Sequence, residues 1–178
     1  NKTVIFERRL DNLMKARLMK VSIEGGEEQP AFDESQTAAQ AASASSDMFP
    51  NASPDGRRIA FTTHSFDSKN LTFHHALKVA EIKDGANIAA PREAKAENVG
   101  WNYRWSKDGK NLLYLGMEGV PNIYELSVDA GKTRPLTNFN SGVILNFDLT
   151  ADGKRLYVVR GIINSDLILI KDNGGNKS

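Results

Sequence analysis

The chain of 178 residues contains no cysteine, which excludes a disulfide framework, a thiolate metal site and a cysteine nucleophile. Its formal net charge is only +1, and no basic run is longer than the pairs Arg8-Arg9 and Arg57-Arg58. Because phosphate neutralisation needs a concentrated basic surface, this balance argues against nucleic acid as a partner. No apolar stretch approaches the roughly 18 residues that cross a bilayer, so we expect no membrane insertion by this chain.

Residues that carry catalysis are also scarce. The three histidines, His64, His74 and His75, share one segment, and the sequence has no Gly-x-Ser-x-Gly elbow and no phosphate-binding glycine loop. A metal site built from these histidines and Asp67 is an alternative, although neighbouring residues of a strand point to opposite faces. We favour polar surface residues in a long loop, and we predict a chain that is not itself an enzyme and that binds no metal or cofactor.

Three similar segments dominate the sequence, each centred on an Asp-Gly pair. From Asp55 to Asp108 is 53 residues, and from Asp108 to Asp152 is 44. Each pair stands between two runs rich in β-forming residues, which predicts a strand, a tight turn with glycine at positive φ, and a second strand. Since the aspartate recurs in every copy, we interpret it as a turn residue that accepts backbone N–H groups. The predicted structural turns are Asp55-Gly56, Asp108-Gly109 and Asp152-Gly153.

A second element follows each of these hairpins: an alternating strand that ends in a polar glycine turn. It occurs four times, at residues 18–26, 77–85, 123–131 and 167–174. Four copies of one element and three of the other indicate stacked four-stranded units. The sequence therefore predicts an all-β fold, a β-propeller of four-stranded antiparallel blades with about 3.5–4 blades in this chain.

The repeats divide the chain into blades with strands a to d, counted from the axis to the rim. The predicted parts are an incomplete blade one (1–32), a loop (33–47), blade two (48–93), blade three (99–138), an incomplete blade four (143–172) and a tail (173–178). A short helix within Leu10–Lys20 is a local alternative, because Leu10, Leu13, Met14 and Leu18 have helical spacing. Blade one lacks strand a and blade four lacks strand d. We therefore expect part of a larger propeller, or closure by strand exchange with another copy.

The motif Ser-Pro-Asp-Gly-x-x-Ile-Ala-Phe, at residues 53–61, resembles the PD40, or TolB-like, propeller repeat. Residues 135–170 resemble, more particularly, the last blade of propellers at the C-terminal end of bacterial serine/threonine kinases and winged-helix regulators. The first resemblance covers nearly the whole chain, and the second covers only its last part. Together they imply a propeller module of a signalling or envelope protein, with a periplasmic or other extracytoplasmic location favoured over the cytoplasm.

Binding on such a scaffold usually belongs to irregular loops. The b–c connection Thr62–Ala76 is the longest of these loops, and Trp101 and Arg104 lie in a neighbouring inner strand, whereas we assign Trp105 to packing between blades. The candidate rim residues are His64, Phe66, His74, His75, Trp101 and Arg104.

We therefore expect a non-catalytic binding, sensory or scaffold propeller that presents this rim to a protein or peptide, or to a small molecule. Another copy of the chain or further blades are additional partners. Two alternatives are the gating propeller of a prolyl-oligopeptidase-like hydrolase and a TolB-type periplasmic translocation component.

Overall fold

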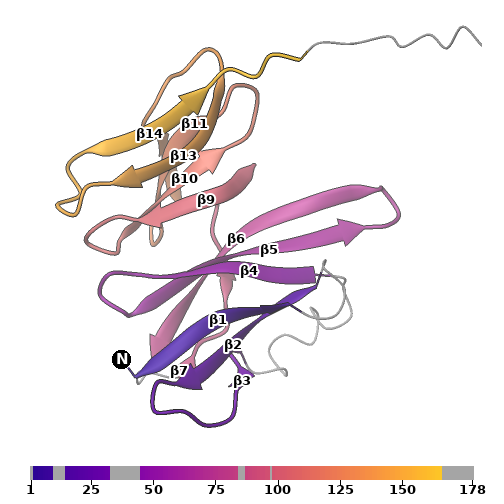
Figure 1. Cartoon of the computed structure of the whole chain (residues 1–178), viewed down its shortest axis with the longest axis vertical. Coiled ribbons are helices and arrows are strands. Elements are labelled where there is room, and N and C mark those ends of the chain that lie inside the picture. The colour runs from indigo at the N-terminus through magenta and orange to yellow at the C-terminus, as the bar shows by residue number, and fades with distance from the viewer. Residues whose placement is uncertain (1, 10–14, 33–44, 84–86, 97, 166–178) are drawn as a thin grey trace, which may run out of the picture.

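The computed structural model describes residues 2–9, 15–32, 45–83, 87–96 and 98–165, and every regular element in these ranges is a β-strand. The strands form small antiparallel sheets that stack face to face as successive blades, from blade one at the bottom of Figure 1 to blade four at the top. This arrangement confirms the predicted all-β fold of part of a propeller. No helix long and apolar enough to cross a membrane occurs in the described residues.

Blade one consists of β1 (Thr3–Arg9), β2 (Ala16–Ser22) and β3 (Gln29–Pro30), in that spatial order. Its strands pair from Thr3↔Ser22 to Arg9↔Ala16. Residues 16–20 are therefore extended and not helical, because the alternation of Ala16 and Leu18 places both side chains in the core. The first part of the alternative helix falls on residues 10–14, outside the described ranges.

Blade two is built from β4 (Ser45–Ala52), β5 (Arg58–Asp67) and β6 (Thr72–Lys83), with the short strands β7 (Asn87–Ile88) and β8 (Arg92–Glu93) both paired to β6. Two expectations are wrong here. The loop predicted over 33–47 gives way to strand β4 at Ser45, because residues 45–48 pair with the far half of β5. Most of Thr62–Ala76 is likewise a paired hairpin and not a loop, since its threonines and phenylalanines favour strands.

Blade three is a complete four-stranded sheet of β9 (Val99–Trp105), β10 (Asn111–Gly116), β11 (Asn122–Ser127) and β12 (Lys132–Pro135). Blade four shows β13 (Val143–Leu149) and β14 (Leu156–Gly161). The further strand predicted near residues 167–170 lies outside the described residues.

The core lies between the blades, because successive residues of one strand face opposite neighbours. In β5, Ile59 and Phe61 pack against blade one, whereas Ala60 packs against blade three. In β10, Leu112 and Tyr114 face blade two, whereas Leu113 and Leu115 face blade four. Every inner blade therefore contributes to two hydrophobic clusters.

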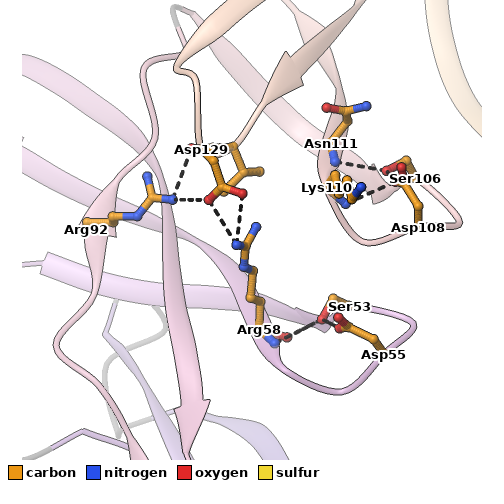
Figure 2. A network of polar contacts seen from close by, with 10 residues as sticks. Ser53, Asp55, Arg58, Arg92, Ser106, Asp108, Lys110, Asn111 and Asp129 are labelled. Atoms are coloured by element: carbon orange, nitrogen blue, oxygen red, sulfur yellow. Dashed lines mark hydrogen bonds and ion pairs between the residues drawn. The ribbon is translucent and has the colours of Figure 1, made fainter.

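The Asp-Gly turns all use the same hydrogen bonds. Ser53 Oγ donates to Asp55 Oδ1 over 2.6 Å, and the same oxygen accepts the Arg57 N–H over 3.0 Å. Equivalent bonds join Ser106, Asp108 and Lys110 in blade three (Figure 2), and Thr150, Asp152 and Lys154 in blade four. The hydroxyl donors, followed by the backbone N–H groups, hold the pKa of each aspartate below its usual value. Gly56, Gly109 and Gly153 have φ of 68°, 67° and 71°, which glycine adopts without steric cost.

Candidate functional site

The hairpin of β5 and β6 projects beyond the neighbouring described strands (Figure 1). Its strands pair without interruption from Arg58↔Glu81 to Asp67↔Thr72, whereas β4 accompanies β5 only as far as Ser45↔Ser65. At the tip, Asp67 Oδ1 accepts the Lys69 N–H over 2.9 Å and Oδ2 accepts the Asn70 amide over 2.7 Å. The end of the hairpin is therefore a regular turn that carries the two strands beyond the blade.

One face of this hairpin is lined by aromatic rings. Cross-strand partners point to the same face, and so do residues two apart, so the pairs His64↔His75 and Phe66↔Phe73 form adjacent rows. The ring centroids of Phe66 and Phe73 are 4.8 Å apart, and those of His64 and His75 are 4.3 Å apart in an edge-on arrangement. The sequence thus places four rings on one side of two paired strands.

Two further rings come from the inner strands of blades two and three. Trp101 of β9 stacks on His64, with centroids 4.7 Å apart and planes 18° apart, and meets the edge of His75 at 5.4 Å. Phe49 of β4 approaches Trp101 edge-on at 6.0 Å. Trp101 nevertheless stays 53% exposed. We call the set the aromatic strip: Phe49, His64, Phe66, Phe73, His75 and Trp101.

A β-bulge positions Phe49. The register of β4 against β5 shifts between Met48 and Asn51, and Phe49 has a φ of 57°. The Phe49 N–H donates to Glu7 Oε2 of blade one over 3.2 Å, and its carbonyl accepts the hydroxyl of Tyr103 from blade three. Bulges commonly redirect a side chain. Here three blades hold the bulge in place, so the ring of Phe49 is turned toward Trp101.

His64 is uncharged at neutral pH. Partial burial, followed by the neighbouring His75, lowers the pKa of His64 from 6.5 to about 4, against a smaller opposing effect of Glu7. Its Nε2 lies 3.1 Å from Thr62 Oγ1, and that hydroxyl donates to the Met48 carbonyl. Thr62 Oγ1 therefore accepts the Nε2–H, which selects the Nε2-protonated tautomer. In this state His64 acts as a flat, neutral ring against Trp101.

The structure brings together four of the six candidate residues, His64, Phe66, His75 and Trp101. His74 lies on the opposite face of the hairpin, paired with Ser65 in the β-ladder, and its Nε2 is 3.3 Å from Thr72 Oγ1. All three histidines belong to paired strands, so the interpretation as loop residues is wrong.

Arg104 does not join Trp101, because residues three apart in a strand face opposite sides. Its guanidinium lies 3.5 Å from Asp148 and 5.9 Å from the ring centre of Phe147, both in blade four. Trp105, in contrast, is buried, and its Nε1 donates to the Asn51 carbonyl over 2.9 Å between blades two and three. Within the described residues, no group of three or more His, Asp or Glu side chains is placed to hold a metal ion.

Phe49 has no distinguishing pattern of its own in the sequence, but the residue after it carries a signal. Pro50 cannot donate to a β-ladder, and within sheets proline is confined to edges, strand starts and bulges. Its position between two alternating segments was therefore a sign of the bulge that turns Phe49 into the strip.

No family model matches the chain. A protein described as a TolB homolog from Chlorobium luteolum is 27% identical over 144 residues, which are 81% of this chain and 30% of that protein. The chain thus spans less than a third of this relative's length.

Solved structures resemble the fold. A putative TolB from Agrobacterium tumefaciens matches 90% of this chain and 51% of its own, with a TM-score of 0.60 and 13% identity. A prolyl endopeptidase matches 90% of this chain and 25% of its own, with a TM-score of 0.61 and 19% identity. The chain is therefore a partial β-propeller, similar in sequence to a TolB homolog and in fold to part of each of these solved proteins.

Proposed function

We propose that this chain is part of a non-catalytic binding propeller whose aromatic strip binds an extended segment of a protein partner. The strip itself is the observation that carries the proposal. Aromatic side chains are enriched at protein interfaces, where they bury a large area at a small cost in side-chain entropy. Trp101 and Phe73, which are 53% and 60% exposed, leave such area available.

The backbone beside the strip favours an extended peptide as the ligand. On the side away from β5, strand β6 pairs with β8 only at Lys78 and Val79 and with β7 only at Ile82 and Lys83. Among the described residues, no strand pairs with this edge of Thr72–Ala76. An added strand would take its main-chain hydrogen bonds there and set alternate side chains against Phe73 and His75. A concave pocket, which small molecules usually require, is not needed for this mode.

The sequence similarity to a TolB homolog supports a more specific form of the proposal, a TolB-type translocation component outside the cytoplasm. The resemblance of residues 135–170 to the last blade of kinase and regulator propellers favours a sensory role in a longer protein instead. Both roles are compatible with a surface that binds a protein partner. The gating propeller of a hydrolase is a further alternative, for which similarity of fold is the only support.

Selection of random peptides displayed on phage, with the full chain immobilised, tests the proposal. We expect selected peptides to be extended and to shift the NMR signals of the Trp101 indole and of the Phe73 and His75 amides on titration. Selection that yields no binder, or binders that leave these signals unchanged, would contradict it.

A further inference from the structure

An ion pair joins blades two and three. One of its members belongs to the repeated Asp-Gly hairpin, and the other belongs to the repeated c–d turn. Arg58, which follows the Asp-Gly turn of blade two, donates to both carboxylate oxygens of Asp129 over 2.9 and 3.0 Å (Figure 2). Asp129 lies in the c–d turn of blade three, and Arg92 of blade two also reaches it at 3.5 Å. The arginine thus belongs to one blade and the carboxylate to the next.

Both members of this pair recur at the outer blades. When residues 150–158 are aligned with 53–61 on their Asp-Gly pairs, Arg155 of blade four takes the place of Arg58. When residues 18–26 are aligned with 123–131 on their last glycines, Glu24 of blade one takes the place of Asp129. Among the ion pairs of the described residues, none includes Arg155, and the carboxylate of Glu24 pairs with the exposed Lys2 at 2.6 Å. Blade four therefore presents the cation of an inter-blade bond, and blade one the anion.

The apolar residues of blade four also indicate a missing neighbour. By the alignment, Tyr157 and Val159 correspond to Leu113 and Leu115 of blade three. Blade four buries those leucines to 3% and 4% exposure, whereas Tyr157 and Val159 are 59% and 55% exposed. The outer face of blade four thus has the pattern of a face that a following blade covers.

Blade one exposes an apolar face that corresponds to a face covered by a preceding blade. Strands β1 and β2 of blade one align with β10 and β11 of blade three. In blade three, the apolar residues on one face of these strands pack against the preceding blade. Five apolar residues of blade one occupy the equivalent positions. Val4 and Ile23 correspond in this way to the buried Leu112 and Val128, yet they are exposed. The outward set is Val4, Phe6, Met19, Val21 and Ile23.

We propose that a second copy of this chain occupies these faces. Blade one of each copy packs on blade four of the other, and Arg155 bonds to Glu24 of the second copy as Arg58 bonds to Asp129. Two such contacts related by a two-fold axis close a ring and leave neither face exposed. Together, two copies contain about seven to eight blades, a number within the usual range of propellers. The pairing is independent of the aromatic strip and of its ligand.

Sedimentation equilibrium of the full chain over a range of concentrations tests this pairing. We expect a species of twice the 19.6 kDa chain mass. Arg155→Glu alone and Glu24→Arg alone each place like charges at both contacts, and each should raise the dimer dissociation constant at least tenfold. Mixing the two variants in equal amounts restores opposite charges at both contacts, so the double mass should return. Lys154→Glu, a charge reversal next to Arg155, is the control and should leave the mass unchanged.

Two results would overturn the proposal. One is a monomer at every concentration, which would mean that a different partner, such as further blades of a longer protein, covers these faces. The other is a dimer that neither charge reversal weakens. Circular dichroism of each variant separates loss of pairing from loss of folding, and recovery of the mixed dimer requires that both variants are folded.

Discussion

The imidazole of His64 lies almost parallel to the indole of Trp101, with ring centroids 4.7 Å apart. His64 belongs to the projecting hairpin of blade two and Trp101 to the innermost strand of blade three. The stack therefore joins two blades and fixes the base of the hairpin against the inner strands. It also covers one face of the Trp101 ring, whose side chain otherwise stays 53% exposed.

His64 should titrate far below a typical histidine. We expect an NMR titration of its ring to give a pKa of about 4, where the ordinary value is 6.5. Between these values the folded state binds fewer protons than the unfolded state, so the free energy of unfolding falls as the pH drops from 6.5 toward 4. His64→Asn should lose less stability than the wild type over this window. Equal losses would contradict the assigned environment.

Tyr103→Phe should loosen the bulge that positions Phe49. The Tyr103 hydroxyl contacts the carbonyls of Phe49 and Ala60 between blades two and three, and the side chain is buried. Because the substitution leaves buried acceptors without their donor, we expect a loss of about 1–3 kcal/mol in the free energy of unfolding. Urea denaturation measures it. Tyr124→Phe, at a tyrosine whose hydroxyl makes no hydrogen bond within the described residues, is the matched control and should change stability by less than about 0.5 kcal/mol.

The pair of Arg58 and Asp129 should couple blades two and three. We expect a double-mutant cycle with Arg58→Leu and Asp129→Asn to give a coupling of about 1 kcal/mol, because the arginine is mostly buried but the carboxylate is exposed. The coupling should weaken as salt is added. A coupling near zero at low salt would show that the contact of Arg58 with Asp129 contributes no stability.

The turn aspartates should make folding sensitive to acid. The hydroxyl and backbone donors that lower the pKa of Asp55, Asp108 and Asp152 stabilise the charged carboxylate in the folded state. This contribution is present above the ordinary carboxyl pKa of 3.8 and is lost as the pH falls through the lowered folded value. We expect Asp108→Asn to lower the melting temperature at neutral pH and to remove part of the acid-induced loss. An unchanged melting temperature at neutral pH would contradict this role.

The repeat made most of the fold predictable. Each Asp-Gly pair with its flanking β-forming runs specifies a hairpin locally, since the turn bonds involve only residues within five positions of one another. Alternation within each strand then assigns its two faces to the two neighbouring blades. The c strands that contain Leu18, Leu77 and Ile123 could be located for the same reason, although the start of the second at Thr72 could not.

The site was less predictable, because it depends on where pairing stops. The extension of β4 to Ser45 and of the hairpin to Asp67 and Thr72 comes from cross-strand contacts that a single strand does not encode. Polar and histidine residues in Thr62–Ala76 suggested a loop, although its β-forming residues support paired strands. Likewise, closeness in sequence grouped Trp101 with Arg104, whereas the alternation of β9 sends them to different blades.

The affinity of the full chain and of Trp101→Ala for one phage-selected peptide tests the role of the aromatic strip most directly. Ile163→Ala, which removes an exposed apolar side chain outside the strip, is the control. We expect Trp101→Ala to weaken binding by about 2 kcal/mol, or roughly thirtyfold, as for an aromatic interface anchor, and Ile163→Ala to leave it unchanged. Equal affinity of the wild type and Trp101→Ala would contradict the account.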